Sequence, residues 1–313
     1  MRGTLLYMGQ RLVLIAITTV LVSSIVFLLL HQIPGNAFLN ETRQSEETLR
    51  AELHHYGLDL PLPQQYANWV TGVLHGNLGE SLVNHGVLIT PLLVRETSVS
   101  ATVGFFALLV TIGLGLVLGV IAALRQNTWV DYIASSTAVI GYSVPSFVIA
   151  IFGLLLFGHY LYVWTDGTVF YQPGWGKVEQ IPVPALALGL PYASYVARLT
   201  RASMLETIRT DYVRTAWAKG LKARVVVLRH ALRNALIPVV TILGPLITGI
   251  ITGSVVIENI FGIPGLGKEF VTSILARDYN IVIGVFTFYA ALVGLANLAV
   301  DVIYPVLDPR IRY

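Results

Sequence analysis

The sequence predicts an all-helical integral membrane protein with six membrane-spanning helices. Its 313 residues are 55% hydrophobic and only 12% charged, with a mean hydropathy of +0.72. In soluble domains about a quarter of the residues are charged. Several uncharged runs are also close to the roughly 20 residues that a helix needs to cross a bilayer. Because such runs recur along the whole chain, we expect one membrane domain rather than two soluble ones.

The first uncharged run, residues 12–30, is expected to be retained as a membrane span. It ends in the sequence HQIPG, without the small-residue cleavage site of a signal peptide. The other predicted spans follow at intervals, at residues 99–124, 132–162, 184–196, 235–257 and 281–300. Within the second span, Gly115-x-x-x-Gly119 has the spacing that allows two helices to approach closely.

The third predicted span is interrupted by Ser143-Val144-Pro145-Ser146. A proline in mid-membrane leaves backbone groups that another polar or helical element must satisfy. Two interpretations remain open, a packing kink and the lining of a polar pathway.

A polar region separates the first two spans and divides the chain into three parts. We expect a surface helix over residues 46–56, ended by Gly57, and a second amphipathic helix over residues 64–74. The region is too short and too polar to bury a core of its own, so a solvated loop on the membrane is favoured over an enzyme domain. The predicted parts are a tail with the first span (1–31), an extracytoplasmic loop (32–98) and a core of five spans (99–313).

The lysines and arginines predict that both chain ends are cytoplasmic. Nine of them fall in one basic stretch, residues 198–238, and placing the N-terminus inside puts this stretch in the cytoplasm. A net charge of +3 concentrated in one loop indicates membrane topology rather than a nucleic-acid surface.

The basic stretch also has helical periodicity. Val213, Ala216 or Trp217, and Gly220 or Leu221 recur at three- and four-residue steps and share one face. A second set follows after residue 222, and Gly220 lies between the two, where a helix can end without a steric penalty. We therefore predict two short amphipathic helices that meet at an angle.

Several other functions are disfavoured by the sequence. Residues 262–268 satisfy the phosphate-loop pattern G-x-x-x-x-G-K, but Glu269 stands where Ser or Thr must reach Mg²⁺, and Pro264 removes a backbone N–H. The absence of cysteine excludes disulfides and thiolate chemistry. The loop histidines lack the spacing of metal ligands and are read as solvated. They are His54, His55, His75 and His85.

Acidic residues are absent from the interiors of the predicted spans, since Asp131 and Asp301 fall at span ends. Ion-coupled carriers usually carry such groups. If this chain moves a solute against a gradient, the energy must therefore enter from outside, and the basic stretch is the expected entry.

The basic stretch resembles the coupling loop of permease subunits of ATP-binding-cassette importers, specifically the peptide/nickel branch. Residues 211–221 (DYVRTAWAKGL) and 229–241 (RHALRNALIPVVT) have this likeness. The general motif E-A-A-x-x-x-G becomes Arg214-Thr215-Ala216-x-x-x-Gly220, so only the second alanine and the glycine are kept, as in the peptide branch. Further similar segments are spread along the chain, at residues 55–66, 76–81, 119–127, 142–147, 198–206, 257–267, 276–285 and 307–313.

The resemblance, to a "B"-type permease of oligopeptide or dipeptide importers, implies a type I importer fold and a set of partners. It implies a homologous second permease, two ATPase subunits and an extracytoplasmic substrate-binding protein. The chain would be no enzyme and hold no cofactor, because ATP and Mg²⁺ would be bound by the ATPases. It would move peptides across the cytoplasmic membrane by alternating access. The open alternatives are nickel chelates, glutathione or another small solute within the family, and a stand-alone channel or ion-coupled carrier outside it.

Two sets of candidate residues follow. The resemblance implies that the first set contacts an ATPase: Asp211, Tyr212, Val213, Arg214, Thr215, Ala216, Trp217, Lys219, Gly220 and Leu221. Polarity within apolar spans suggests the second set as a pathway lining: Ser143, Pro145, Ser146, Thr248, Thr252, Ser254 and Glu258.

Overall fold

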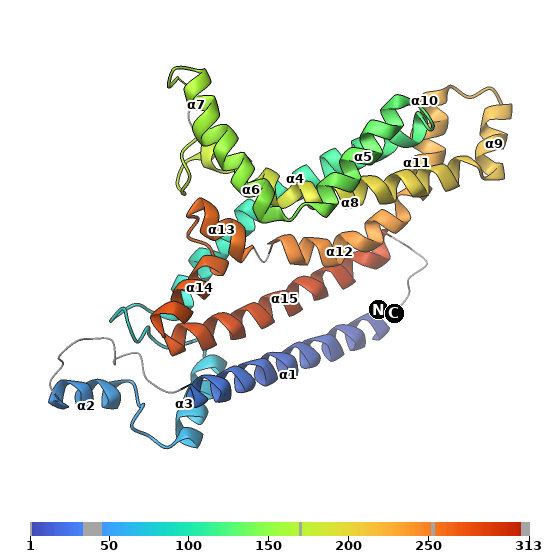
Figure 1. The fold of residues 1–313 in the computed structure, drawn as a ribbon. Helices are drawn as coiled ribbons and strands as arrows, with labels where there is room; N and C mark the ends of the chain where they lie inside the picture. Colours follow the sequence, from blue (N-terminus) through green and yellow to red (C-terminus); the bar gives the residue numbers. More distant parts are fainter. Residues whose placement is uncertain (1, 34–45, 169–170, 252–253, 308–313) are drawn as a thin grey trace. The chain divides into compact units, whose positions relative to one another are not determined.

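The computed structural model describes residues 2–33, 46–168, 171–251 and 254–307, and these residues form two compact units (Figure 1). Every regular element in these ranges is helical, and one isolated antiparallel bridge joins Glu80 and Leu88. The predicted all-helical class is confirmed. Each unit is described separately.

The first unit combines residues 1–99 with residues 264–298, apart from the undescribed positions. It contains α1 (Arg2–Gln32), α2 (Glu46–His55), α3 (Leu62–Leu74), the beginning of α4 (Ile89–Leu124), α14 (Leu266–Ala276) and most of α15 (Tyr279–Leu307). The α2 and α3 helices match the two expected loop helices. Gly57, with a φ of +67°, follows α2 as predicted, in a conformation that favours glycine.

The core of the first unit gathers apolar side chains from three separate stretches of sequence. Leu78, Ile89 and Leu93 pack against Leu266 and residues of α15. The carboxylate of Asp278, just before α15, fastens this arrangement because it accepts hydrogen bonds from the Ser81 hydroxyl and from three backbone N–H groups. Those donors are Leu82, Val83 and Ile281, at 3.2, 3.3 and 3.2 Å. A buried carboxylate with this many donors is a fixed structural joint.

The second unit combines residues 100–263 with the C-terminal part of α15. Its elements are most of α4, α5 (Trp129–Ser143), α6 (Ser146–Leu154), a π-helical turn (Leu155–Tyr160), α7 (Leu161–Trp164), a 3-10 turn (Val178–Gln180), α8 (Pro182–Ile208), α9 (Asp211–Ala218), α10 (Ala223–Val225), a second π-helical turn (Val226–Ala231), α11 (Leu232–Ala235), α12 (Ile237–Ile251) and α13 (Val255–Phe261). The α8 helix is the axis of this unit, since α5 and α6 pack along it (Figure 1).

Glycines bring α4 and α8 into close contact. A Cβ added at Gly115 would lie 2.7 Å from the Val196 side chain, and one at Gly119 would lie 2.6 Å from the carbonyl oxygen of Ala197. From the other side, a Cβ at Gly189 of α8 would lie 2.6 Å from the carbonyl oxygen of Ala107. The close approach predicted from the Gly115-x-x-x-Gly119 spacing is confirmed.

Two predicted spans are broken, one of them unexpectedly. The α5 helix ends at Ser143 and α6 begins at Ser146, with Val144 and Pro145 in extended conformations, as the sequence predicted. The membrane span over residues 235–257 stays a prediction, but its helix is interrupted at Ser254. The α12 helix ends at Ile251 and α13 begins anew at Val255, because Ser254 is extended and its hydroxyl accepts the Ile257 N–H.

Four of the described helical segments are long and apolar enough to cross a membrane: residues 6–32, 89–124, 146–164 and 279–302. A fifth arises if the bent pair 223–235 and 237–250, which meet at 52°, counts as one span. The α8 helix, which holds the predicted fourth span, does not meet this criterion. Six spans therefore stay a prediction.

Candidate functional site

The basic stretch folds into a helical hairpin that projects from the end of α8 (Figure 1). The α9 helix starts at Asp211, whose charge suits the positive end of the helix dipole. It ends in a turn in which Gly220 has a φ of +74° and donates its N–H to the Trp217 carbonyl at 2.9 Å. Only glycine enters this left-handed conformation without strain, so the predicted helix end at Gly220 is confirmed.

One face of α9 packs inside the chain. Val213 is 0% and Ala216 is 5% exposed, and both join a cluster with Met204, Val226 and Ala231. The resemblance gave these two residues a contact with an ATPase. In this structure they hold α9 against its own unit instead, because the second helix of the hairpin covers them.

The opposite face of α9 and the following turn are exposed. Trp217 is 46% and Leu221 37% exposed, so two large apolar side chains lie at the surface of the hairpin. We call this the outer ridge; it consists of Asp211, Tyr212, Arg214, Thr215, Trp217, Lys219, Gly220 and Leu221. The hydroxyl of Tyr212 accepts a 2.7 Å hydrogen bond from the Asn234 amide, which ties the ridge to α11.

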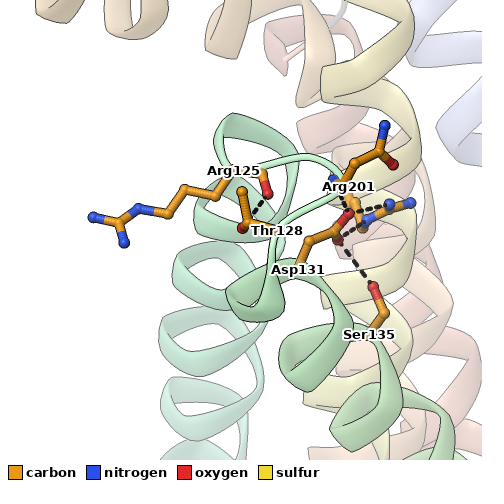
Figure 2. A network of polar contacts seen from close by, with 6 residues as sticks. Arg125, Thr128, Asp131, Ser135 and Arg201 are labelled. Atoms are coloured by element: carbon orange, nitrogen blue, oxygen red, sulfur yellow. Dashed lines mark hydrogen bonds and ion pairs between the residues drawn. The ribbon is translucent and has the colours of Figure 1, made fainter.

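A partly buried ion pair joins α8 to α5 near the hairpin end of α8 (Figure 2). The Arg201 guanidinium donates to both carboxylate oxygens of Asp131, at 2.6 and 2.8 Å, and links α8 to the first turn of α5. Asp131 also accepts the Asn127 N–H at 3.0 Å and the Ser135 hydroxyl at 3.2 Å. These bonds, that from Arg201 foremost, lower the pKa of Asp131 to about 2.

Sequence reasoning placed Asp131 at a span end but did not pair it. The partner lies 70 residues away, so no local spacing could have identified it. The one signal in the sequence was that an acidic residue at a span end and a stretch rich in arginine were predicted on the same side of the membrane.

The candidate pathway residues fall into three groups. Ser143 and Pro145 are exposed at the break between α5 and α6, and Ser146 is half-buried there. Thr248 and Glu258 are buried, and Glu258 accepts a 2.7 Å hydrogen bond from the Ser100 hydroxyl, so their burial does not support a lining role. Ser254 caps α13, and Thr252 lies outside the described residues.

The phosphate-loop pattern at residues 262–268 is a turn between two helices. Gly262 ends α13 with a φ of +67°, and α14 begins at Leu266. Burial raises the pKa of Glu269, which stands where a phosphate loop needs a hydroxyl. Among the described residues, no group of three potential metal ligands occurs, and His54 pairs with Asp59 at 2.8 Å.

Four described helical segments that are long and apolar enough to cross a membrane indicate a multi-pass membrane protein. The family comparison is specific. The chain belongs to the family of binding-protein-dependent transport system inner membrane components, whose model matches residues 115–313, and residues 4–94 match the N-terminal model of the same kind of protein. It is therefore a multi-pass inner-membrane permease subunit and not an enzyme. Family and fold imply that it works with binding-protein and ATPase components.

Similar proteins share nearly the whole chain. The dipeptide transport system permease protein DppB of Bacillus subtilis is 40% identical, over 98% of this chain and 97% of its own. The oligopeptide transport system permease protein OppB of Escherichia coli K12 is 39% identical, over 95% of both chains. Among solved structures, an inward-facing form of the MetNI methionine ABC transporter shares the fold, with a TM-score of 0.55 and 20% identity over 69% of this chain and 96% of that chain.

Proposed function

We propose that this chain is the permease subunit of an ATP-driven importer of dipeptides or oligopeptides. The observation that carries the proposal is the identity of 37–40% to named peptide permeases over nearly the full length of both chains. Such an extent includes both units and the hairpin, so the likeness is not limited to a shared membrane fold.

In this proposal both chain ends and the hairpin face the cytoplasm. The basic stretch supports this orientation, since cytoplasmic loops of membrane proteins carry an excess of lysine and arginine. A second, homologous permease would complete the pathway, and a substrate-binding protein would dock on the opposite side. ATP and Mg²⁺ would be held by two ATPase subunits, with no cofactor in this chain.

The outer ridge is the proposed contact with an ATPase. Its aromatic and apolar side chains lie between charged ones, the arrangement of a protein interface with an anchor at its centre. Trp217 is the proposed anchor, and Val213 and Ala216 support it from within. When the ATPase pair closes, a displaced ridge would move α8, which precedes the hairpin in the same unit.

The test is a reconstitution of the full transporter in proteoliposomes. Trp217→Ala should lower the ATP hydrolysis stimulated by peptide-loaded binding protein, together with peptide uptake, by at least tenfold, as for an interface anchor worth about 2 kcal/mol. The matched control is Trp164→Ala, because Trp164 is 69% exposed but lies on α7, away from the hairpin. This control should keep both activities.

Three results would overturn parts of the proposal. Unchanged ATP hydrolysis and peptide uptake in the Trp217→Ala complex would show that the outer ridge does not couple the permease to the ATPase. Uptake of nickel chelates or glutathione in place of peptides would replace the substrate class. Solute movement by this chain without ATPases would indicate a channel or carrier.

A further inference from the structure

Arg198 of α8 lies inside the second unit, although it is the first residue of the basic stretch. It stands ten residues, or about 15 Å, before the end of α8 at Ile208. Its guanidinium lies over the rings of Tyr142 and Tyr195, 4.9 and 5.8 Å from their centroids. Tyr195 precedes it by one turn of α8. The Arg198 side chain therefore extends away from the hairpin, towards the N-terminal end of its helix, as helical side chains do.

The neighbouring helices show how deep in the membrane this point lies. Tyr142 is thirteen residues, or about 20 Å, along α5 from Trp129, which follows the polar turn between α4 and α5. On α4, Gly119 packs against Ala197, the residue before this arginine, and residues 99–124 of α4 include no charged side chain. The hydrocarbon core of a bilayer is about 30 Å thick. The guanidinium therefore lies within the apolar layer and not at the headgroup surface.

The surface around Arg198 differs from a surface that faces lipid. Arg198, Tyr142 and Ser143 are exposed, and Tyr192 of α8 is 37% exposed. By contrast, the exposed large apolar side chains of α1 between residues 6 and 29 are all Leu, Val or Ile. An arginine that faces hydrocarbon is costly, and charged residues within membrane segments usually face a water-filled path. This face of α5 and α8 therefore indicates such a path.

The interruption between α5 and α6 supports the same conclusion independently. It follows Tyr142 directly, with Val144 and Pro145 in extended conformations. Non-helical backbone at membrane depth is tolerated where it is buried in protein or lines a water-filled cavity. Ser143 and Pro145 are exposed, so burial does not account for this break. Of the two interpretations that the sequence left open, the lining of a polar pathway is favoured.

The charge of Arg198 is held in place but not neutralised. Among the described residues, the ion pairs do not include it. The rings of Tyr142 and Tyr195 stack on each other, with centroids 5.8 Å apart, and both attract the cation. Ring contacts use none of the guanidinium N–H groups, which can still bind a carboxylate through two parallel hydrogen bonds. The three residues thus form a positioned anion-binding group beside a polar break.

We propose that Arg198, held by Tyr142 and Tyr195, binds the C-terminal carboxylate of a peptide as it passes through the permease. This inference rests on the proposed function, which supplies the peptide. The carboxylate is common to all peptides, so the contact does not depend on their side chains. An exposed site also lets the peptide leave again, as transport requires.

The first experiment is photochemical capture on the assembled transporter in nanodiscs, without nucleotide. Tyr142→p-benzoylphenylalanine keeps an aromatic ring at the site. The matched control is Phe105→p-benzoylphenylalanine on α4, since Tyr142 is 53% and Phe105 is 54% exposed. A radiolabelled dipeptide at millimolar concentration should be captured at position 142 and not at position 105. The same dipeptide with a C-terminal amide should be captured about tenfold less, because it offers Arg198 no carboxylate.

The second experiment separates transport from ATP hydrolysis in proteoliposomes. Arg198→Gln should lower peptide uptake about tenfold or more, while the ATP hydrolysis stimulated by loaded binding protein stays close to the wild-type rate, because the hairpin is unchanged. Arg198→Lys keeps the charge without the paired donors and should recover part of the uptake. The matched control is Arg125→Gln, whose exposed side chain points away from Asp131 (Figure 2). Both activities of this control should stay within about twofold of the wild type.

Several results would overturn the inference. They are equal capture of the dipeptide and its amide, capture at position 105 as strong as at position 142, and unchanged uptake in Arg198→Gln. An equal loss in Arg125→Gln, or a parallel loss of ATP hydrolysis in Arg198→Gln, would indicate a general or structural effect and would also overturn it. Capture of the second permease in place of the dipeptide would assign the site to a subunit contact.

The two ideas can fail separately. If Arg198→Gln does not assemble, capture at position 142 decides the question, because that variant keeps Arg198. A wild-type transporter that imports no peptide would refute the proposed function itself. Peptide import that is indifferent to Arg198 would refute only this inference.

Discussion

Replacing Asp131 with asparagine should destabilise the second unit by about 2–3 kcal/mol. The Asp131 side chain is 3% exposed, and that of Arg201 is 29% exposed. Breaking a fully buried ion pair costs about 3–5 kcal/mol, and the partial exposure of Arg201 reduces this range. The lowering of the pKa of Asp131 to about 2, caused mainly by the bond from Arg201, has the same direction and a size of about 2 kcal/mol.

The assay is reversible unfolding of the purified permease in mixed micelles, with thermal unfolding as a second measurement. A loss of 2–3 kcal/mol should lower Tm by about 5–10 °C for a unit of this size. A double-mutant cycle with Arg201→Met separates the pair from its surroundings and should give a coupling energy above about 1 kcal/mol.

The pH dependence has a definite sign. The folded-state pKa of Asp131 lies below its unfolded value, so the pair contributes its full stability above about pH 4 and loses it as the pH falls towards 2. The difference in the free energy of unfolding between the wild type and Asp131→Asn should therefore decrease as the pH falls from about 4 to 2. A cost below about 0.5 kcal/mol, or a coupling energy of zero, would show that water already screens the pair and would refute the reasoning.

Two further predictions use matched controls. Gly119→Ala should lower the free energy of unfolding by about 1–3 kcal/mol in the same assay, because its Cβ would lie 2.6 Å from the backbone of α8. Gly113→Ala on the same helix, where a Cβ would have nothing within 4 Å, should be neutral or stabilising. Equal effects of the two substitutions would contradict the close contact. Asp278→Asn should lower the free energy of unfolding by about 2 kcal/mol and speed amide hydrogen exchange at Leu82 and Val83, whose N–H groups donate to this carboxylate. The matched control Asp59→Asn, in an exposed pair, should leave Tm and these exchange rates unchanged. Unchanged exchange in Asp278→Asn would contradict the structural role of this carboxylate.

The features that the sequence predicted correctly have local causes. The break at Ser143–Ser146 follows from a proline that cannot continue a helix, and the end of α9 follows from a glycine that enters a left-handed turn. The contact at Gly115 and Gly119 needs only a spacing along one helix. Each of these signals acts within a few residues.

The features that the sequence missed depend on distant partners. Asp131 and Arg201 are 70 positions apart, and Asp278 meets Ser81 across 197. Helical periodicity correctly grouped Val213 with Ala216, but it could not say which protein would cover that face. The restart of the helix at Val255 was missed because apolar composition continues across the break.

The continuity of α8 has a mechanical consequence. Its 27 residues, which include Pro191, make a helix about 40 Å long, and α9 follows its C-terminal end. The close contacts at Gly189 and Gly119 hold α4 against α8, so we expect the two helices to move together. Simple geometry makes a tilt of about 5° at one end a displacement of about 3.5 Å at the other, close to the width of an atom. Under the proposed function, a small rotation of the hairpin would therefore displace the far end of α8 by several ångströms.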